Sequence, residues 1–172
     1  LVRNVICGLN ASLLAGVHRR SVFIEMLRDP RDAAASILAC RRTHAGGAHR
    51  WWSLRPSTWP PPHALPDTGA APNPAAAAEV ARQVLDIHAD LDAEAASVPA
   101  PAAWIRVPYG RLCADPAAVL EEVAAAAGRV APVRGGIDID ASRLASRDVR
   151  GTPAAHPEEL AAIDAVLAAD RG

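Results

Sequence analysis

The sequence predicts an α/β fold in which a parallel sheet is covered by helices. Two apolar segments, 21–27 and 103–107, have the length and the β-branched or aromatic content of buried strands. Segments of helical length lie before, between and after them, and such alternation is typical of parallel strands joined by helices. Two strands are few for a sheet. We therefore expect the sheet to be incomplete in this chain, which we treat as one domain over residues 1–172.

Three of the helices share the same start signal, an Asp or Asn followed by Pro. Proline suits the first helical position, and the side chain before it can accept hydrogen bonds from free backbone N–H groups. The three signals are Asp29-Pro30, Asn73-Pro74 and Asp115-Pro116. We expect the second of these helices to run to about residue 97, and the third to end at Gly128 as a C-cap.

Apolar spacing supports the helix after Asn73 and predicts two more. In the helix over 74–97, one face carries Val80, Val84, Ile87 and Leu91. A helix over 5–15 should precede the first strand. A last helix should span 157–170, with Leu160, Ile163 and Leu167 facing inward.

Residues 43–73 are expected to form an irregular loop. It is too long for a passive connection in a compact domain, so it is either functional or partly disordered. It contains Trp51-Trp52 and Trp59, which could form an aromatic platform for a flat acceptor or cover the edge of the core. It also holds three of the histidines: His44, His49 and His63.

Charge and composition limit the possible functions. The 172 residues have a net charge of -1 with 18 basic and 19 acidic side chains, which argues against a nucleic-acid binder. All 18 basic residues are Arg, and nine of them lie in residues 1–60 beside three acidic residues. This imbalance indicates a local anionic ligand, or else an ordinary solvated face. No apolar run is long enough to span a membrane, so we expect a cytoplasmic protein.

The most informative segment is the turn from the first strand into the helix at Asp29. Arg28 stands at the carboxyl end of the strand, where open α/β sheets bind ligands, and helix N-termini favour phosphates. Ser36 lies about two helical turns after Asp29 and returns to the same face. A guanidinium and a hydroxyl there could hold one phosphate, because Arg makes bidentate contacts to phosphate oxygens. Alternatively, Arg28 pairs with Asp32 or Glu25.

The segment 23–36 resembles the 3'-phosphate-binding segment of sulfotransferases that use 3'-phosphoadenosine 5'-phosphosulfate (PAPS). That family carries an apolar strand, Arg-Asp-Pro-Arg, and a Ser eight residues after the first Arg, as here at Arg28 and Ser36. The phrase Trp51-Trp52-x-x-x-Pro56-x-x-Trp59 is similar to one in bacterial carbohydrate-type members. Residues 105–116 resemble a later strand and its Tyr-Glu-Asp-Leu-x-x-Asp-Pro segment.

The resemblance implies a P-loop-like sulfotransferase fold and transfer of a sulfuryl group from PAPS to an acceptor hydroxyl or amine, without a metal. It places Arg28 and Ser36 on the 3'-phosphate of the cofactor. Tyr109 would lie near the adenine, or else supply a structural hydroxyl at the end of the strand. Arg150 and Gly151 match the end of a late cofactor-binding element. Trp51, Trp52 and Trp59 would face a small-molecule or carbohydrate acceptor.

The chain also departs from the family pattern. Tyr109 is followed by Gly110 and Arg111, where the family has an acidic pair that steadies the turn. The family's glycine-rich phosphosulfate loop has no counterpart in residues 1–20, and no Lys occurs to replace its basic residue. We therefore expect a C-terminal portion of the fold that is inactive as an isolated chain and prone to homo-oligomerise. The catalytic base is not identified.

Other readings remain open. The chain could be a non-catalytic nucleotide-binding or interaction remnant of the same fold, whereas a P-loop kinase would need a Gly-x-x-x-x-Gly-Lys motif. The loop histidines could supply a base but lack the fixed spacing of metal ligands. The acidic residues of the helix over 74–97 are expected to form a solvated face. The three cysteines, at 7, 40 and 113, are expected to be reduced and mostly buried.

Overall fold

The computed structural model describes residues 8–43, 71–130 and 155–170. The chain divides into two compact units. The first unit comprises Leu1–Arg28 and Asp90–Arg150, and the second comprises Asp29–Ala89 and Gly151–Gly172. Within the described residues, no helix is both long enough and apolar enough to cross a membrane.

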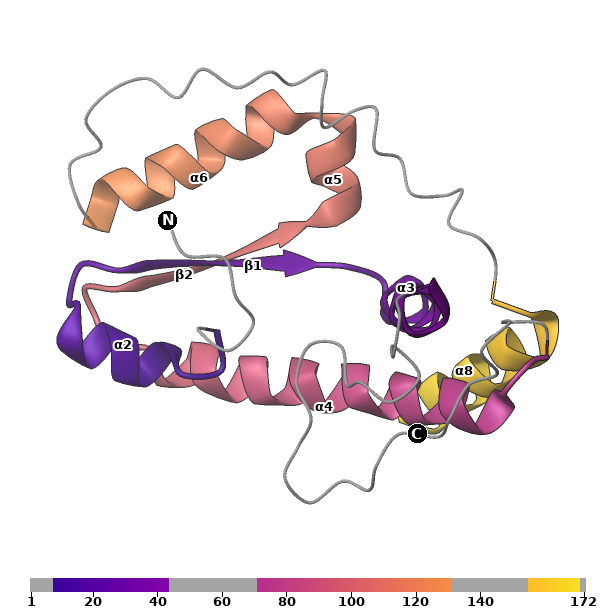
Figure 1. Ribbon diagram of the computed structural model, residues 1–172. Coiled ribbons are helices and arrows are strands. Elements are labelled where there is room, and N and C mark those ends of the chain that lie inside the picture. The colour runs from indigo at the N-terminus through magenta and orange to yellow at the C-terminus, as the bar shows by residue number, and fades with distance from the viewer. Residues whose placement is uncertain (1–7, 44–70, 131–154, 171–172) are drawn as a thin grey trace. The chain divides into compact units, whose positions relative to one another are not determined.

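The first unit contains a two-stranded parallel sheet (Figure 1). Strand β1 (Val22–Leu27) pairs with β2 (Ala103–Pro108) along its whole length. The prediction of an α/β fold with parallel strands is thereby confirmed at this coarse level. The finer sulfotransferase topology stays a prediction.

The two faces of this sheet differ in chemistry. Partners in a parallel register share a face, and the pairs Phe23–Trp104 and Glu25–Arg106 therefore lie together. The rings of Phe23 and Trp104 stack with centroids 5.8 Å apart. The opposite face carries the buried Val107, and helix α6 packs against β2 (Figure 1).

The helices of the first unit differ from the prediction in three places. Helix α2 (Ala11–Val17) begins after a turn at Leu9 and Asn10, so one continuous helix over 5–15 is wrong. Helix α6 (Pro116–Val130) continues through Gly128, which is therefore not a C-cap. A short helix α5 (Tyr109–Ala114) follows β2, where the sequence suggested only a turn.

The second unit is helical and contains the main cluster of buried apolar residues. It consists of α3 (Pro30–Thr43), the residues of α4 (Pro74–Ser97) up to Ala89, and α8 (Pro157–Ala169). Each helix contributes apolar residues to the core, as the apolar spacing predicted for α4 and α8. The fully or almost fully buried residues are Ala34, Leu38, Ala76, Ala77, Val80, Ala81, Val84, Ala155, Ile163 and Leu167. The small alanines let these helices approach closely.

The three helix-start predictions are confirmed by hydrogen bonds. Asp29 Oδ1 accepts from the backbone N–H of Arg31 at 2.8 Å. Asn73 Oδ1 accepts from Ala76 N at 3.0 Å, and Asp115 Oδ1 accepts from Ala118 N at 3.1 Å. Each side chain thus satisfies one N–H group that the first helical turn leaves without a partner.

Candidate functional site

The carboxyl edge of the sheet brings two of the predicted site residues together. Leu27 and Pro108 are register partners at the ends of β1 and β2, so the next residues, Arg28 and Tyr109, emerge side by side. The Arg28 Cζ lies 5.8 Å from the centroid of the Tyr109 ring, a cation–π arrangement. Both residues are half-buried. Sequence alone suggested each residue separately; their contact follows from the strand register.

Within the described part of the first unit, the Arg28 guanidinium forms no ion pair with a carboxylate. Glu25, one of its two alternative partners, instead accepts hydrogen bonds from Trp104 Nε1 at 2.8 Å and Arg106 Nε at 3.0 Å. The prediction that Arg28 pairs with Glu25 is thus wrong. An Arg that rests one face of its planar head on an aromatic ring keeps its N–H edges available for phosphate oxygens.

Ser36, the proposed partner of Arg28, lies in the second unit. It is half-buried in α3, two turns after the capping residue Asp29. Arg28 belongs to the first unit and Ser36 to the second, so a joint phosphate site of the two residues stays a prediction. The nearby Arg31 is already engaged, because its guanidinium binds Asp164 at 2.6 and 3.2 Å. That hydrogen bond raises the pKa of Arg31.

Several predicted residues lie outside the described residues. These are the aromatic residues Trp51, Trp52 and Trp59, the late pair Arg150 and Gly151, and the histidines His44, His49 and His63. Their assignments to acceptor, cofactor and base remain predictions.

The segment after Tyr109 is held by an ion pair with the next helix. Arg111 forms a bidentate ion pair with Glu122, which joins α5 to α6. This hydrogen bond raises the pKa of Arg111 and lowers that of Glu122. At Gly110, a Cβ would meet no atom within 4 Å, so no close approach demands glycine there. Arg111 therefore joins α5 to α6, although such an exposed ion pair contributes little stability.

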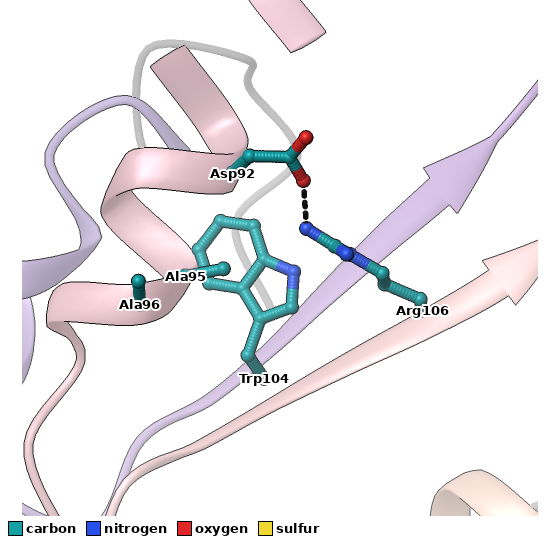
Figure 2. A pocket seen from close by; sticks show the side chains of 5 residues that line it. All are labelled: Asp92, Ala95, Ala96, Trp104 and Arg106. Carbon is teal, nitrogen blue, oxygen red and sulfur yellow. Dashed lines mark hydrogen bonds and ion pairs between the residues drawn. The ribbon is translucent and has the colours of Figure 1, made fainter. Parts of the chain in front are cut away.

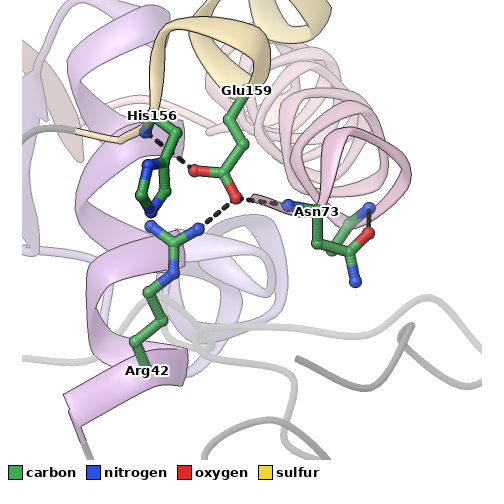
Figure 3. A network of polar contacts seen from close by, with 5 residues as sticks. Arg42, Asn73, His156 and Glu159 are labelled. Carbon is green, nitrogen blue, oxygen red and sulfur yellow. Dashed lines mark hydrogen bonds and ion pairs between the residues drawn. The ribbon is translucent and has the colours of Figure 1, made fainter. Parts of the chain in front are cut away.

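A buried polar network holds the second unit together (Figure 3). Glu159 is fully buried, and its carboxylate accepts hydrogen bonds from Arg42 Nη2, Asn73 N at 2.7 Å and His156 N at 3.0 Å. Burial alone would raise the pKa of Glu159, but these hydrogen bonds outweigh it and lower the pKa. The network joins the end of α3 to the starts of α4 and α8, so its role is structural.

A second buried ion pair lies in the same unit. Arg41 Nη1 is 3.9 Å from Glu79 Oε2, and the two side chains are 0% and 6% exposed. Burial lowers the pKa of Arg41, and the charge of Glu79 partly offsets this effect. The adjacent arginines at the end of α3 thus belong to the interior of the fold, so the Arg-rich first third is not simply a solvated face.

An open cavity of about 650 Å³ lies between α4 and β2 in the first unit (Figure 2). It is lined by Asp92, Ala95, Ala96, Trp104 and Arg106. The sequence does not predict this cavity, because Trp104 and Arg106 lie in a predicted strand and Asp92 on a helix face expected to be solvated. The alternation of polar and aromatic residues in both strands is a signal that could have located this face, once their register was known.

Two acidic residues of α4, on the face that was expected to be solvated, interact with other parts of the first unit. Asp92 binds Arg106, and Glu94 accepts a hydrogen bond from Ser12 N at 2.8 Å. Among the described residues, no three His, Cys, Asp or Glu side chains are grouped in a way that could hold a metal ion. Cys40 and Cys113 are half-buried, less buried than expected.

Comparison with known proteins identifies no relatives of this chain: no family model, no curated protein and no solved structure matches it significantly.

Proposed function

We propose that this chain binds a 3'-phosphorylated adenine nucleotide at the carboxyl edge of β1 and β2, as a protein similar to PAPS-dependent sulfotransferases. The observation that supports the proposal most is the contact between Arg28 and the Tyr109 ring, 5.8 Å from guanidinium carbon to centroid. Ligands of open α/β sheets bind at this edge. An arginine without an acidic partner there in the described part of the unit suits an anionic group.

The proposed chemistry assigns each residue a specific task. Arg28 would donate two parallel N–H bonds to the 3'-phosphate, with its plane steadied by Tyr109. In sulfuryl transfer from PAPS to an acceptor hydroxyl or amine, these residues position the donor and neutralise charge, because a loose transition state leaves little covalent work to the protein.

The proposal is tested by comparing two nucleotides that differ in one phosphate. Isothermal titration calorimetry of the 172-residue chain should give tighter binding for 3'-phosphoadenosine 5'-phosphate than for adenosine 5'-phosphate. One charge-assisted hydrogen bond contributes about 1.5–3 kcal/mol, so we expect a difference of roughly tenfold or more. Equal affinity, or no binding of either nucleotide, would contradict the proposal.

The alternative is a non-catalytic nucleotide-binding protein of the same fold. It is favoured by one sequence observation: Tyr109 is followed by Gly110 and Arg111, where the family has an acidic pair. Incubation with labelled PAPS and a panel of sugar, phenol and amine acceptors distinguishes the two functions. Transfer of label to any acceptor supports the enzyme, whereas tight nucleotide binding without transfer supports the alternative.

A further inference from the structure

The cavity between α4 and β2 is separate from the carboxyl edge of the sheet. Arg106, which lines the cavity, precedes Tyr109 by three residues, so about 10 Å of strand separates them. The side chains of Asp92, Trp104 and Arg106 converge on the cavity in Figure 2. None of these residues takes part in the nucleotide site proposed above.

The indole of Trp104 is held in a fixed position beside this cavity. Its Nε1 donates a hydrogen bond to Glu25 Oε2 at 2.8 Å, and its ring stacks on Phe23 with an interplanar angle of 24°. The helix opposite contributes the Asp92 carboxylate at the rim and two methyl groups, from Ala95 and Ala96. The ring is therefore pre-organised, and a ligand can approach it without displacing a long side chain.

Among the described residues, the ion-paired side chains beside the cavity carry an excess of one negative charge. Glu25 is 8% exposed and forms an ion pair with Arg106, which also binds Asp92. The Arg106 guanidinium donates hydrogen bonds to Glu25 and Asp92, and these raise the pKa of Arg106, which stays charged. Two carboxylates thus share one guanidinium, and Asp92, with 64% of its side chain exposed, faces solvent at the rim. An anionic ligand would be repelled here.

A π-face beside a carboxylate is a suitable environment for an organic cation. The negative face of an indole attracts ammonium groups, and Trp is the strongest aromatic partner for them. We infer that the cavity lined by Asp92, Ala95, Ala96, Trp104 and Arg106 binds a small ligand with an alkylammonium group. The group rests on the indole, and Asp92 supplies the opposing charge.

The test compares choline with 3,3-dimethylbutan-1-ol, which has the same shape without the charge. Both are titrated into the 172-residue chain, and binding is followed by calorimetry and by the NMR signal of the Trp104 indole N–H. Cation–π attraction predicts that choline binds at least about fivefold tighter than the alcohol. Equal binding of the two, or no binding of choline, would overturn the inference.

Matched variants locate the site. Ala95→Leu places a larger side chain in the cavity from the α4 side and should reduce choline affinity tenfold or more. Ala93→Leu, at an exposed position of the same helix that does not line the cavity, should leave it unchanged. Asp92→Asn removes the rim charge at an exposed position and should weaken choline binding about threefold or more while sparing the alcohol. Choline binding that is insensitive to both Ala95→Leu and Asp92→Asn would refute this location.

Discussion

The carboxylate of Glu159 accepts a hydrogen bond from the guanidinium of Arg42, a residue 117 positions earlier in the chain. The Glu159 side chain is 0% exposed and that of Arg42 is 13% exposed. The same carboxylate accepts the backbone N–H groups of Asn73 and His156. One buried side chain thus joins three helices of the second unit. We therefore expect the free energy of unfolding to depend on this carboxylate and on its ionisation.

Removal of this carboxylate should strongly destabilise the second unit. In Glu159→Ala, the Arg42 guanidinium and two backbone N–H groups lose their acceptor, and breaking a buried pair costs about 3–5 kcal/mol. The free energy of unfolding, measured by urea denaturation, should fall by that order. Asp164→Asn serves as the control, because the Arg31–Asp164 pair is half-exposed and should contribute less than about 1 kcal/mol. Equal losses in the two variants would contradict this assignment.

The same network predicts a pH dependence of stability. The pKa of Glu159 is lower in the folded protein than the ordinary value of 4.5, so the unfolded chain binds its proton more readily. The contribution is therefore fully present above pH 4.5 and is lost as the pH falls through the folded pKa. Urea midpoints of the wild-type protein and Glu159→Gln should differ by a constant amount above about pH 5 and converge below pH 4.5. A difference that stays constant down to pH 3 would show that ionisation of Glu159 is irrelevant.

Gly128 tests the course of helix α6. A Cβ at this position would meet no atom within 4 Å, and the helix continues to Val130. Gly128→Ala should therefore stabilise the protein by roughly 0.5–1 kcal/mol, because alanine restricts the unfolded chain and favours the helix. A rise in the melting temperature checks this expectation. If Gly128 instead ended the helix in a left-handed conformation, the same change would lower the melting temperature.

Tyr109 should contribute to nucleotide binding through its ring face. Tyr109→Leu removes the cation–π contact with Arg28, which is worth about 0.5–1 kcal/mol at an exposed site. Affinity for 3'-phosphoadenosine 5'-phosphate should fall about two- to fivefold. Tyr109→Phe keeps the ring, so it should retain most of that affinity. If the two variants bind equally well, the ring does not orient Arg28.

The parts of the fold that sequence predicts correctly depend on local signals. The caps Asp29, Asn73 and Asp115 lie directly before their helices, and the apolar spacing in α4 and α8 identifies their buried faces. Helix α5 was missed because Gly110 and the Pro before Tyr109 suggest a turn, whereas the Arg111–Glu122 pair ties this segment to α6.

The parts that sequence missed depend on contacts between distant segments. The Glu159 network joins residues more than eighty positions apart, and no local pattern indicates which carboxylate will be buried. The cavity beside Trp104 likewise requires the register of β1 and β2. Arg28 and Tyr109 were selected singly by resemblance, and only that register places them in contact.

The most direct test of the proposed nucleotide site is the effect of Arg28→Ala on two affinities measured by calorimetry. We predict that binding of 3'-phosphoadenosine 5'-phosphate weakens about tenfold or more, whereas binding of adenosine 5'-phosphate changes little. Arg129→Ala, at an exposed position of α6, is the matched control and should change neither. Circular dichroism verifies that both variants are folded. Equal losses for the two nucleotides in Arg28→Ala, or no loss at all, would contradict a 3'-phosphate site at Arg28.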